Sequence, residues 1–362
     1  MTLSSVAMFP ARVIVTGASG HLGGWIAAIL VERGHEVLGT SGPGEDPRDI
    51  RDRLVAAGVD RRRFDMVTLD LLAEEDLAGL LAGREALIHV AAPIPLHLPE
   101  ASPSMLRAAR EGTRRILESA ATAGVRRIVS TSSIMAAVYG PGHGSPGLLQ
   151  ETDWSAPETE PMTAYAIAKT EAERESWRCA TELALDLTVV NPGVLLGPGL
   201  TGSVSASLNV FHEALAGRAT ISPRVLLPVA DVRDVARLHV DALAAPASIG
   251  ERIFCVSEQV WLIDLIEMIR AESGLDTLPA PRLLHDELAR KIADSFSMLR
   301  YLRYDIGESR AIDRGKAAKL VGARWRPLAE TVRDTIAYLR EVFPDLRQPA
   351  GSAPRPIVKA PV

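Results

Sequence analysis

Residues 12–24 read RVIVTGASGHLGG, a short apolar run followed directly by a glycine-rich turn. Arg12 to Thr16 have the length and composition of a buried strand, and Leu22 to Arg33 fit the helix that follows. Glycines between a strand and a helix let the backbone turn tightly and approach a pyrophosphate, whose charge then lies at the helix N-terminus. This placement predicts a dinucleotide-binding turn, although an ordinary βα turn without a ligand can have the same spacing.

The rest of the first half alternates strand and helix patterns. Further strands are expected over 36–40, 64–69, 86–90, 127–131 and 187–190, and further helices over 47–57, 74–81, 102–123 and 162–183. Such alternation produces right-handed βαβ units and a parallel sheet between two helical layers. We therefore predict an α/β fold with a Rossmann-type doubly wound parallel sheet, in a nucleotide-binding domain over residues 11–192.

The pattern changes after residue 192. Glycines and prolines crowd residues 193–202, and looser elements follow: strands at 224–228 and 252–256, and helices at 232–243, 262–272 and 328–342. We interpret residues 193–346 as a smaller C-terminal α/β substrate lobe, too fragmented to continue the sheet cleanly and interwoven with the first domain. Residues 347–362 are rich in Pro and Ala, which predicts a disordered tail.

Composition excludes several classes of protein. The chain has 362 residues, 47% of them hydrophobic, and a formal net charge of −5. Because the charges are interspersed and the net charge is small, a nucleic-acid or membrane-surface partner is not expected. No apolar run approaches the roughly 18 residues that a membrane span needs, and residues 1–10 lack the features of a signal peptide. We expect a cytoplasmic protein, monomeric or homodimeric, that acts on a small molecule.

Metal and disulfide chemistry are not expected. Cys179 and Cys255 are too few for a disulfide framework or a metal cage, and the histidines are scattered along the chain. His89, on a predicted buried strand, is interpreted as a core residue.

Tyr165 and Lys169 give the sharpest chemical signal. The spacing of four residues places both side chains on one face of the helix predicted over 162–183. An ammonium group near a phenol favours the phenolate, so the lysine is expected to lower the tyrosine pKa from about 10. Such a phenol can give its proton to a carbonyl oxygen as hydride arrives at the carbon. The alternative is an exposed helical pair without a role.

Hydroxyl and small residues follow other strands of the predicted sheet. Thr131, Ser132 and Ser133 close the fifth strand, where a hydroxyl could hold a substrate carbonyl. Asp70 follows the third strand and could accept a hydrogen bond from an adenine amine, although a turn or helix cap explains it equally well. Ala91, Ala92 and Pro93 follow the fourth strand and would let a cofactor lie flat. Ligands bind at this carboxyl edge in open α/β sheets.

The end of the second strand bears on the choice of nicotinamide cofactor. An acidic residue about 20 positions after the glycines would favour NAD. That place holds Thr40, Ser41 and Gly42 instead, and the two hydroxyls could donate to a 2′-phosphate, with His21 nearby. We therefore expect NADP, with NAD as the alternative.

Taken in order, these motifs resemble the extended short-chain dehydrogenase/reductases, and among them the dihydroflavonol-reductase-like aldehyde and ketone reductases. The resemblance runs from residue 12 to about 339. It is carried by VTGASGHLGG (15–24), HVAAP (89–93), STSS (130–133), ETDWS (151–155), AYAIAKTEAE (164–173), VNPGVLLGP (190–198), DVRDVARLHVDAL (231–243) and WRPLAETVRDT (325–335).

The resemblance implies roles for individual positions. Ser133, Tyr165 and Lys169 would be the catalytic serine, the proton donor and the lysine that holds the nicotinamide ribose; whether Ser132 or Ser133 matches is open by one place, and Ser133 is preferred. The cofactor would contact Gly17, Ser19, Gly20, His21, Leu22, Thr40, Ser41, Asp70, Leu71, Ala91, Ala92, Pro93, Tyr165, Lys169, Pro192, Gly193 and Val194. The implied reaction is NAD(P)H-dependent reduction of a carbonyl compound.

Departures from the family narrow this expectation. Plant flavonoid reductases carry an asparagine shortly after the serine, where this chain has the apolar residues 134–138, so an apolar aldehyde or ketone fits better than a flavonoid. A hydroxysteroid dehydrogenase stays open. A sugar-nucleotide dehydratase is disfavoured because its Asp-Glu pair is missing after the serines, and an epimerase because the acid after the second strand is missing. A non-catalytic NADP sensor is disfavoured because Tyr165 and Lys169 are both present.

Overall fold

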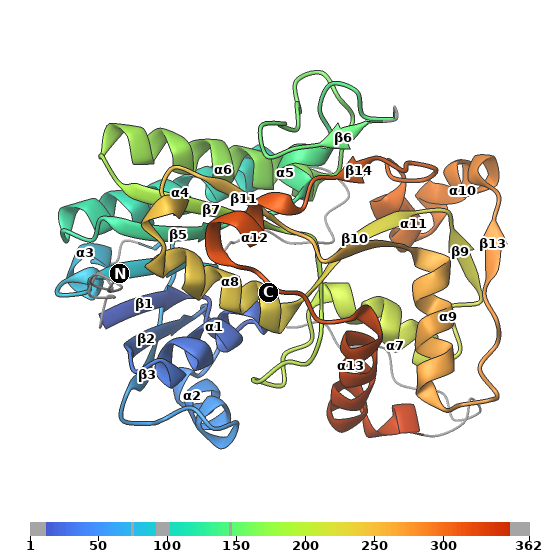
Figure 1. Ribbon diagram of the computed structural model, residues 1–362, viewed down its shortest axis with the longest axis horizontal. Helices are drawn as coiled ribbons and strands as arrows, with labels where there is room; N and C mark the ends of the chain where they lie inside the picture. Colours follow the sequence, from blue (N-terminus) through green and yellow to red (C-terminus); the bar gives the residue numbers. More distant parts are fainter. Residues whose placement is uncertain (1–11, 74–75, 92–101, 145–146, 348–362) are drawn as a thin grey trace, which may run out of the picture.

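The computed structural model describes residues 12–73, 76–91, 102–144 and 147–347. Its centre is a seven-stranded sheet in the order β11-β7-β5-β4-β1-β2-β3, with every neighbouring pair parallel (Figure 1). The strands are β1 (Arg12–Thr16), β2 (Glu36–Ser41), β3 (Phe64–Thr68), β4 (Ala86–His89), β5 (Arg127–Thr131), β7 (Asp186–Pro192) and β11 (Arg252–Cys255). This order confirms the predicted Rossmann-type fold.

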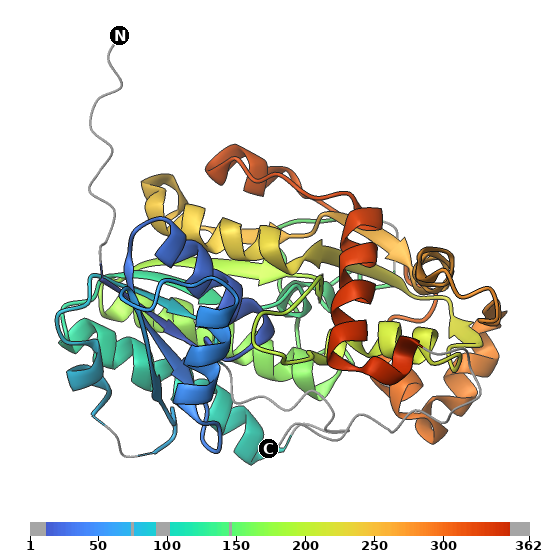
Figure 2. The same ribbon diagram turned by 90° about the horizontal axis from the view of Figure 1, so that it is seen from below.

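Helices cover both faces of the sheet (Figures 1 and 2). One layer contains α1 (His21–Glu32), α2 (Pro47–Ala56), α8 (Val232–Ala244) and α12 (Gly315–Val321), and the other contains α3 (Leu77–Leu81), α4 (Pro103–Thr122) and α6 (Ala164–Glu182). The alternation of side chains along β1 explains why both faces are apolar: Val13 and Val15 pack in the first layer, and Ile14 packs in the second.

A second lobe forms the right-hand part of Figure 1. It contains the three-stranded sheet β12-β10-β8, the pair β13-β9 and a separate apolar core. Its elements are β8 (Val194–Leu196), β9 (Ile221–Pro223), β10 (Leu226–Asp231), β12 (Glu258–Trp261), β13 (Arg282–Leu284), α7 (Asn209–Leu215), α9 (Leu262–Ser273), α10 (Asp286–Ile292), α11 (Ser297–Leu302) and α13 (Leu328–Val342). Between the lobes lie α5 (Met135–Val138) and the pair β6 (Leu148–Leu149) with β14 (Ala311–Ile312).

The C-terminal half is more closely joined to the first domain than expected. The segment after residue 192 does continue the large sheet, because β11 pairs with β7 at its edge. Helix α8 also returns to pack against α1. The chain thus returns to the first domain after the predicted boundary at residue 192. The helix expected over 74–81 begins at Leu77, directly after its cap residue Asp76.

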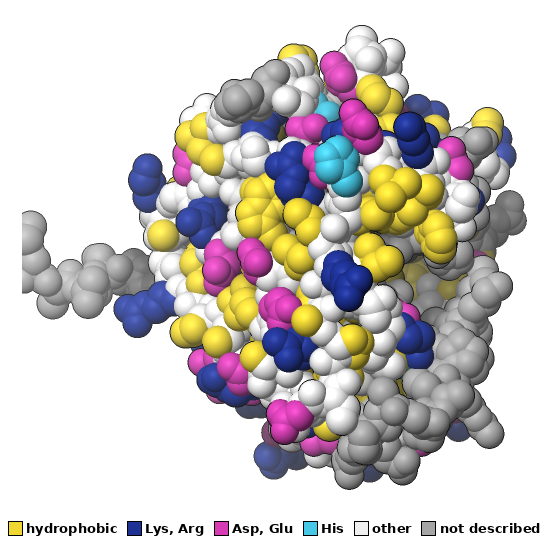
Figure 3. Space-filling view, turned by 90° about the vertical axis from the view of Figure 1, so that its right-hand side faces the viewer, with side chains coloured by type: hydrophobic (Ala, Val, Ile, Leu, Met, Phe, Trp, Pro, Cys, Tyr) yellow, Lys and Arg dark blue, Asp and Glu magenta, His cyan; other side chains and the backbone are white. Residues whose placement is uncertain are grey.

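The outer end of the second lobe carries apolar and charged side chains side by side (Figure 3). Ile221 on β9, Leu283 on β13 and Leu288 on α10 are exposed. None of the helices in the described ranges is long and apolar enough to cross a membrane, and the same ranges contain no cluster of residues suited to a metal ion.

Candidate active site

The glycine turn is packed too tightly for side chains. Gly17 has a positive φ of 72°, and a Cβ atom there would lie 3.0 Å from the backbone nitrogen of Ala91. At Gly23, a Cβ atom would lie 2.1 Å from the carbonyl oxygen of Gly17. Glycine is therefore required both for the turn and for the close approach of α1 to it. Gly20 is the N-cap residue, so the first turn of α1 faces the carboxyl edge of the sheet.

Two threonines tie the strand ends together around this turn. The hydroxyl oxygen of Thr16 accepts hydrogen bonds from the backbone nitrogens of Val90 (3.1 Å) and Ala91 (3.2 Å). The hydroxyl oxygen of Thr40 accepts one from the Gly17 nitrogen (3.2 Å). Ala91 thus lies beside the turn, whereas Ala92 and Pro93 fall outside the described residues.

The side chain of His21 is directed at a loop of the second lobe. One ring nitrogen, Nε2, lies 3.0 Å from the Gly197 carbonyl oxygen, and Nδ1 lies 3.2 Å from the Ser205 hydroxyl. Burial lowers the pKa of this imidazole. With both ring nitrogens engaged, the expectation that His21 helps to hold a 2′-phosphate is wrong for this structure. Leu22 likewise packs its side chain into the core, so both residues present only backbone to a ligand.

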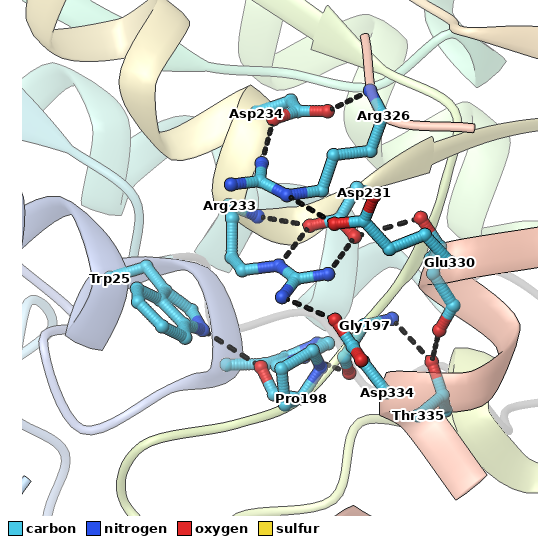
Figure 4. Close-up of polar contacts among 12 residues, drawn as sticks. Trp25, Gly197, Pro198, Asp231, Arg233, Asp234, Arg326, Glu330, Asp334 and Thr335 are labelled. Carbon is cyan, nitrogen blue, oxygen red and sulfur yellow. Dashed lines mark hydrogen bonds and ion pairs between the residues drawn. The ribbon is translucent and has the colours of Figure 1, made fainter. Parts of the chain in front are cut away.

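The same loop joins α1 to the helices of the C-terminal half (Figure 4). Trp25 on α1 donates its indole N–H to the Pro198 carbonyl (2.7 Å), and the Gly197 nitrogen donates to Thr335 on α13 (2.9 Å). Arg233 on α8 bridges Asp231 (2.7 Å) and Asp334 (2.6 Å). The glycine turn and the second lobe are therefore held in one arrangement by polar contacts.

The end of β2 forms a corner that we call the β2 corner, made by Ser19, Ser41, Gly42 and Glu45. Ser41 is 1% exposed, and its hydroxyl has no hydrogen-bond partner among the described residues. The carboxylate of Glu45 folds back into this corner, where it accepts hydrogen bonds from the Ser19 hydroxyl (2.7 Å) and the Gly42 nitrogen (2.9 Å). Although residues 40–42 contain no acid, the carboxylate of Glu45 thus lies at this end of the sheet.

The neighbouring strand end gives Asp70 a local contact. Its Oδ1 accepts a hydrogen bond from the backbone nitrogen of Leu72 (2.8 Å), which is the turn role that the sequence left open. Leu71 packs its side chain into the core beneath the sheet. The Leu69 nitrogen donates to the Ser41 carbonyl (2.9 Å), so the ends of β2 and β3 lie side by side.

At the other end of the carboxyl edge, the β5 and β7 strands bring Ser133 beside Pro192. The Ser132 nitrogen donates to the Val190 carbonyl (2.8 Å), and the Ile134 nitrogen donates to the Pro192 carbonyl (2.9 Å). Gly193 is close-packed, since a Cβ atom there would lie 2.3 Å from the Pro228 carbonyl oxygen. Val194 follows as the first residue of β8.

Helix α6 adds the tyrosine and the lysine to this end. The helix begins at Ala164, directly before Tyr165, because the Thr163 side chain caps it through the Ala166 nitrogen (3.2 Å). The ammonium nitrogen of Lys169 lies 5.9 Å from the centre of the Tyr165 ring. The structure thus brings together Ser133, Tyr165 and Lys169, as the sequence predicted.

Burial dominates the pKa values of this group. It raises the pKa of Tyr165, and the interaction of the phenol with the Ser133 side chain acts in the opposite direction. The pKa of Tyr165 is therefore shifted upward by burial, whereas the sequence pointed to a downward shift caused by Lys169. Burial also lowers the pKa of Lys169 to about 8, against the opposing effect of Glu173.

Comparison with known proteins identifies the family. Residues 13–256 match the NAD dependent epimerase/dehydratase family. Cinnamoyl-CoA reductase 1 of Oryza sativa subsp. japonica is 34% identical over 262 residues, which are 71% of this chain and 75% of the rice protein. The chain belongs to the NAD-dependent epimerase/dehydratase family. Both results confirm the extended short-chain dehydrogenase/reductase resemblance and its reductase branch.

Two further proteins match over nearly the whole chain. Tetraketide alpha-pyrone reductase 1 of Arabidopsis thaliana is 28% identical over 334 residues, covering 91% of this chain and 95% of that protein. The crystal structure of yeast methylglyoxal/isovaleraldehyde reductase complexed with NADPH superposes with a TM-score of 0.70 at 21% identity, covering 93% of this chain and 100% of that one. At that identity the likeness concerns the fold.

The buried carboxylate of Glu173, close to Lys169 on α6, was not predicted from the sequence. Glu173 lies on α6 one turn after Lys169 and accepts hydrogen bonds from the Ser132 hydroxyl (2.6 Å), the Asn191 amide (2.7 Å) and the Arg252 guanidinium (2.5 Å). Its i+4 spacing from Lys169 was a signal for its position on the helix face. That spacing did not indicate its hydrogen-bond partners, which lie directly after β5, on β7 and on β11.

This network separates the two serines. The hydroxyl of Ser132 is committed to Glu173, whereas the side chain of Ser133 interacts with the Tyr165 phenol. A small cavity of about 20 Å³, room for one water molecule, lies behind Lys169 and is lined in part by His89, Ser132 and Glu173. The pKa of His89 is lowered to about 4 by burial and by Lys169, so this histidine is neutral.

A tyrosine of the second lobe, Tyr301, was also missed. Burial raises the pKa of Tyr301 on α11, and its interactions with Tyr165 and Asp305 act in the same direction. Tyr139, next to the predicted apolar stretch 134–138, donates its phenol proton to Asp305 (2.8 Å). The region facing Tyr165 is therefore less apolar than the sequence suggested.

Proposed function

We propose that this protein is an NADPH-dependent carbonyl reductase that reduces an aldehyde or ketone, with Tyr165 as the proton donor. The observation that carries the proposal is the meeting of Ser133, Tyr165 and Lys169 at one end of the carboxyl edge of the sheet, beside Pro192. The reductases among its relatives support the same reaction class.

The residues at the other end fit the proposed cofactor. The glycine turn leaves no room for side chains between the sheet and α1, as a pyrophosphate site requires. At the β2 corner, the Ser19 hydroxyl and the Gly42 nitrogen already bind an anionic group, the carboxylate of Glu45. The hydroxyl of Ser41, the residue before Gly42, is buried and has no hydrogen-bond partner among the described residues. Such a donor set suits a 2′-phosphate, which supports NADP, with NAD as the alternative.

When bound, the nicotinamide supplies a hydride to the carbonyl carbon. The chain's own residues handle the oxygen and its proton. The phenol of Tyr165, protonated at neutral pH because burial raises its pKa, donates its proton to the carbonyl oxygen. The hydroxyl of Ser133 orients that oxygen by a hydrogen bond, and the positive charge of Lys169 stabilises the phenolate that remains.

The direct test is a screen for substrate-dependent oxidation of NADPH. Aromatic aldehydes, ketoesters and steroid ketones are each offered to the purified protein, and the loss of reduced nicotinamide absorbance is followed. We expect turnover with an apolar aldehyde or ketone. Turnover confined to steroid ketones would favour a hydroxysteroid dehydrogenase. Tightly held NAD without net oxidation, together with conversion of a sugar nucleotide, would contradict the proposal and favour an epimerase.

A further inference from the structure

Glu45 occupies a site built by two segments that are far apart in the sequence. Its Oε2 atom accepts one hydrogen bond from the Ser19 hydroxyl in the glycine turn (2.7 Å) and one from the Gly42 nitrogen directly after β2 (2.9 Å). Neither donor carries a charge. One carboxylate oxygen is thus held at the place where the glycine turn and the end of β2 meet.

Two arginines of α2, the helix that follows this loop, form ion pairs with other carboxylates. Arg51 on α2 pairs with Asp65 on β3 (3.3 Å), and Arg53 pairs with Asp49 (2.9 Å) on the same helix. The negative charge of Glu45 at the corner is therefore balanced by hydrogen bonds rather than by either of these arginines. A second anion that entered the corner would meet a like charge and the same two donors.

We propose that Glu45 competes internally for the 2′-phosphate subsite and sets the balance between NADPH and NADH. This inference rests on the proposed function. A 2′-phosphate can use the Ser19 hydroxyl and the Gly42 nitrogen only after the carboxylate leaves, because two anions in contact repel each other. An adenosine ribose with a free 2′-hydroxyl can instead donate to the carboxylate in place, as acids at this end of the sheet do in NAD-binding proteins.

The exposure of Glu45 makes this competition reversible. The residue is exposed and lies in the loop between β2 and α2, so its side chain can swing into solvent without disturbing the core. Ser19, by contrast, is buried and stays in the turn. Removing the carboxylate should therefore free a rigid donor set for a phosphate.

The test measures binding of NADPH and NADH separately, by titration calorimetry at fixed ionic strength, without any carbonyl substrate. The variants are Glu45→Gln, which keeps the length but removes the charge, and Glu45→Ala. Glu36→Gln is the matched control, because Glu36 is an exposed glutamate at the opposite end of the same strand. We expect both Glu45 variants to bind NADPH about tenfold more tightly, with NADH binding unchanged or weaker.

A third variant tests whether the freed donors are the cause. Adding Ser19→Ala to Glu45→Ala should remove most of the gain in NADPH affinity, because the hydroxyl donor is lost. The proposal is overturned if the Glu45 variants leave NADPH affinity unchanged or weaken it, or if Glu36→Gln tightens NADPH equally. Failure of the wild-type protein to bind either nucleotide would instead overturn the proposed function itself, and this inference with it.

Discussion

The two ends of the carboxyl edge of the sheet are built in different ways. At one end, Tyr165 and Lys169 stand on a helix held by the buried Glu173–Arg252 pair. At the other, the β2 corner depends on an exposed glutamate in a short loop. The difference teaches that the groups we propose for the reaction are fixed by the core, whereas the group that we propose for cofactor choice is held by surface contacts. Mutations should therefore affect chemistry at the first end and preference at the second.

The largest effect is expected at the reacting end. Replacing Tyr165 with Phe removes the proton donor with little change in packing, and kcat should fall by roughly 10²–10⁴. Nucleotide affinity, measured by titration, should change little because the phenol acts on the carbonyl oxygen. Near-normal turnover in this variant would mean that another group supplies the proton.

Breaking the ion pair between Glu173 and Arg252 should lower the free energy of unfolding. Glu173→Ala leaves the Arg252 guanidinium buried without its carboxylate, and the free energy of unfolding should fall by about 3–5 kcal/mol. Glu182→Ala removes the exposed partner of Arg178 on the same helix and should cost much less, because exposed ion pairs contribute little to stability. Urea titrations of both variants measure the difference. Equal losses would show that the Glu173 pair is no more important than a surface contact.

The pH dependence of kcat/KM for carbonyl reduction should follow the protonation state of Lys169. Its pKa is lowered to about 8 by burial, so the ammonium form is present below pH 8 and is lost as the pH rises through that value. The groups that face it are Glu173 on its own helix, which opposes this shift, and His89 on β4, which is neutral. Tyr165 stays protonated in this range because its pKa is raised. The value of kcat/KM should therefore fall roughly tenfold per pH unit above about 8; a flat profile up to pH 10 would contradict this role.

The smallest effect is expected in the substrate region. Val138 is partly buried beside Met135 on the apolar side of α5. Val138→Asn should lower kcat/KM for apolar ketones by roughly tenfold, which corresponds to a loss of about 1–2 kcal/mol in transition-state stabilisation. Leu148→Asn, at a half-exposed position on β6, is the control. An unchanged substrate profile in the Val138 variant would show that this side chain does not line the pocket.

The reacting end was predictable because its signals are local. Tyr165 and Lys169 are one helical turn apart, and Ser133 lies two residues after β5, which pairs with β7, the strand that ends at Pro192. The first relation follows from helix periodicity, and the second from the rule that the carboxyl ends of parallel strands meet at one edge of the sheet. The direction of the Tyr165 pKa was not predictable, because it depends on how deeply the tertiary structure buries the phenol.

The β2 corner was not predictable for a different reason. The sequence showed Thr40, Ser41 and Gly42 at the strand end, but periodicity does not determine the path of the short loop that brings Glu45 back to Ser19. His21 was misassigned similarly, because its partners Gly197 and Ser205 come from a distant loop. Contacts between segments far apart in the chain thus account for the errors at this end.

The most direct test of the central claim is isotope transfer. The protein is incubated with a carbonyl substrate found in the screen and with NADPH that carries deuterium at the transferable position, and the product is analysed by mass spectrometry. Wild-type protein should give an alcohol with one deuterium on the former carbonyl carbon, and Tyr165→Phe should give the same product at a rate lower by roughly 10²–10⁴. An alcohol without deuterium, or equal rates for the two proteins, would contradict the assignment of this site as a Tyr165-dependent carbonyl reductase.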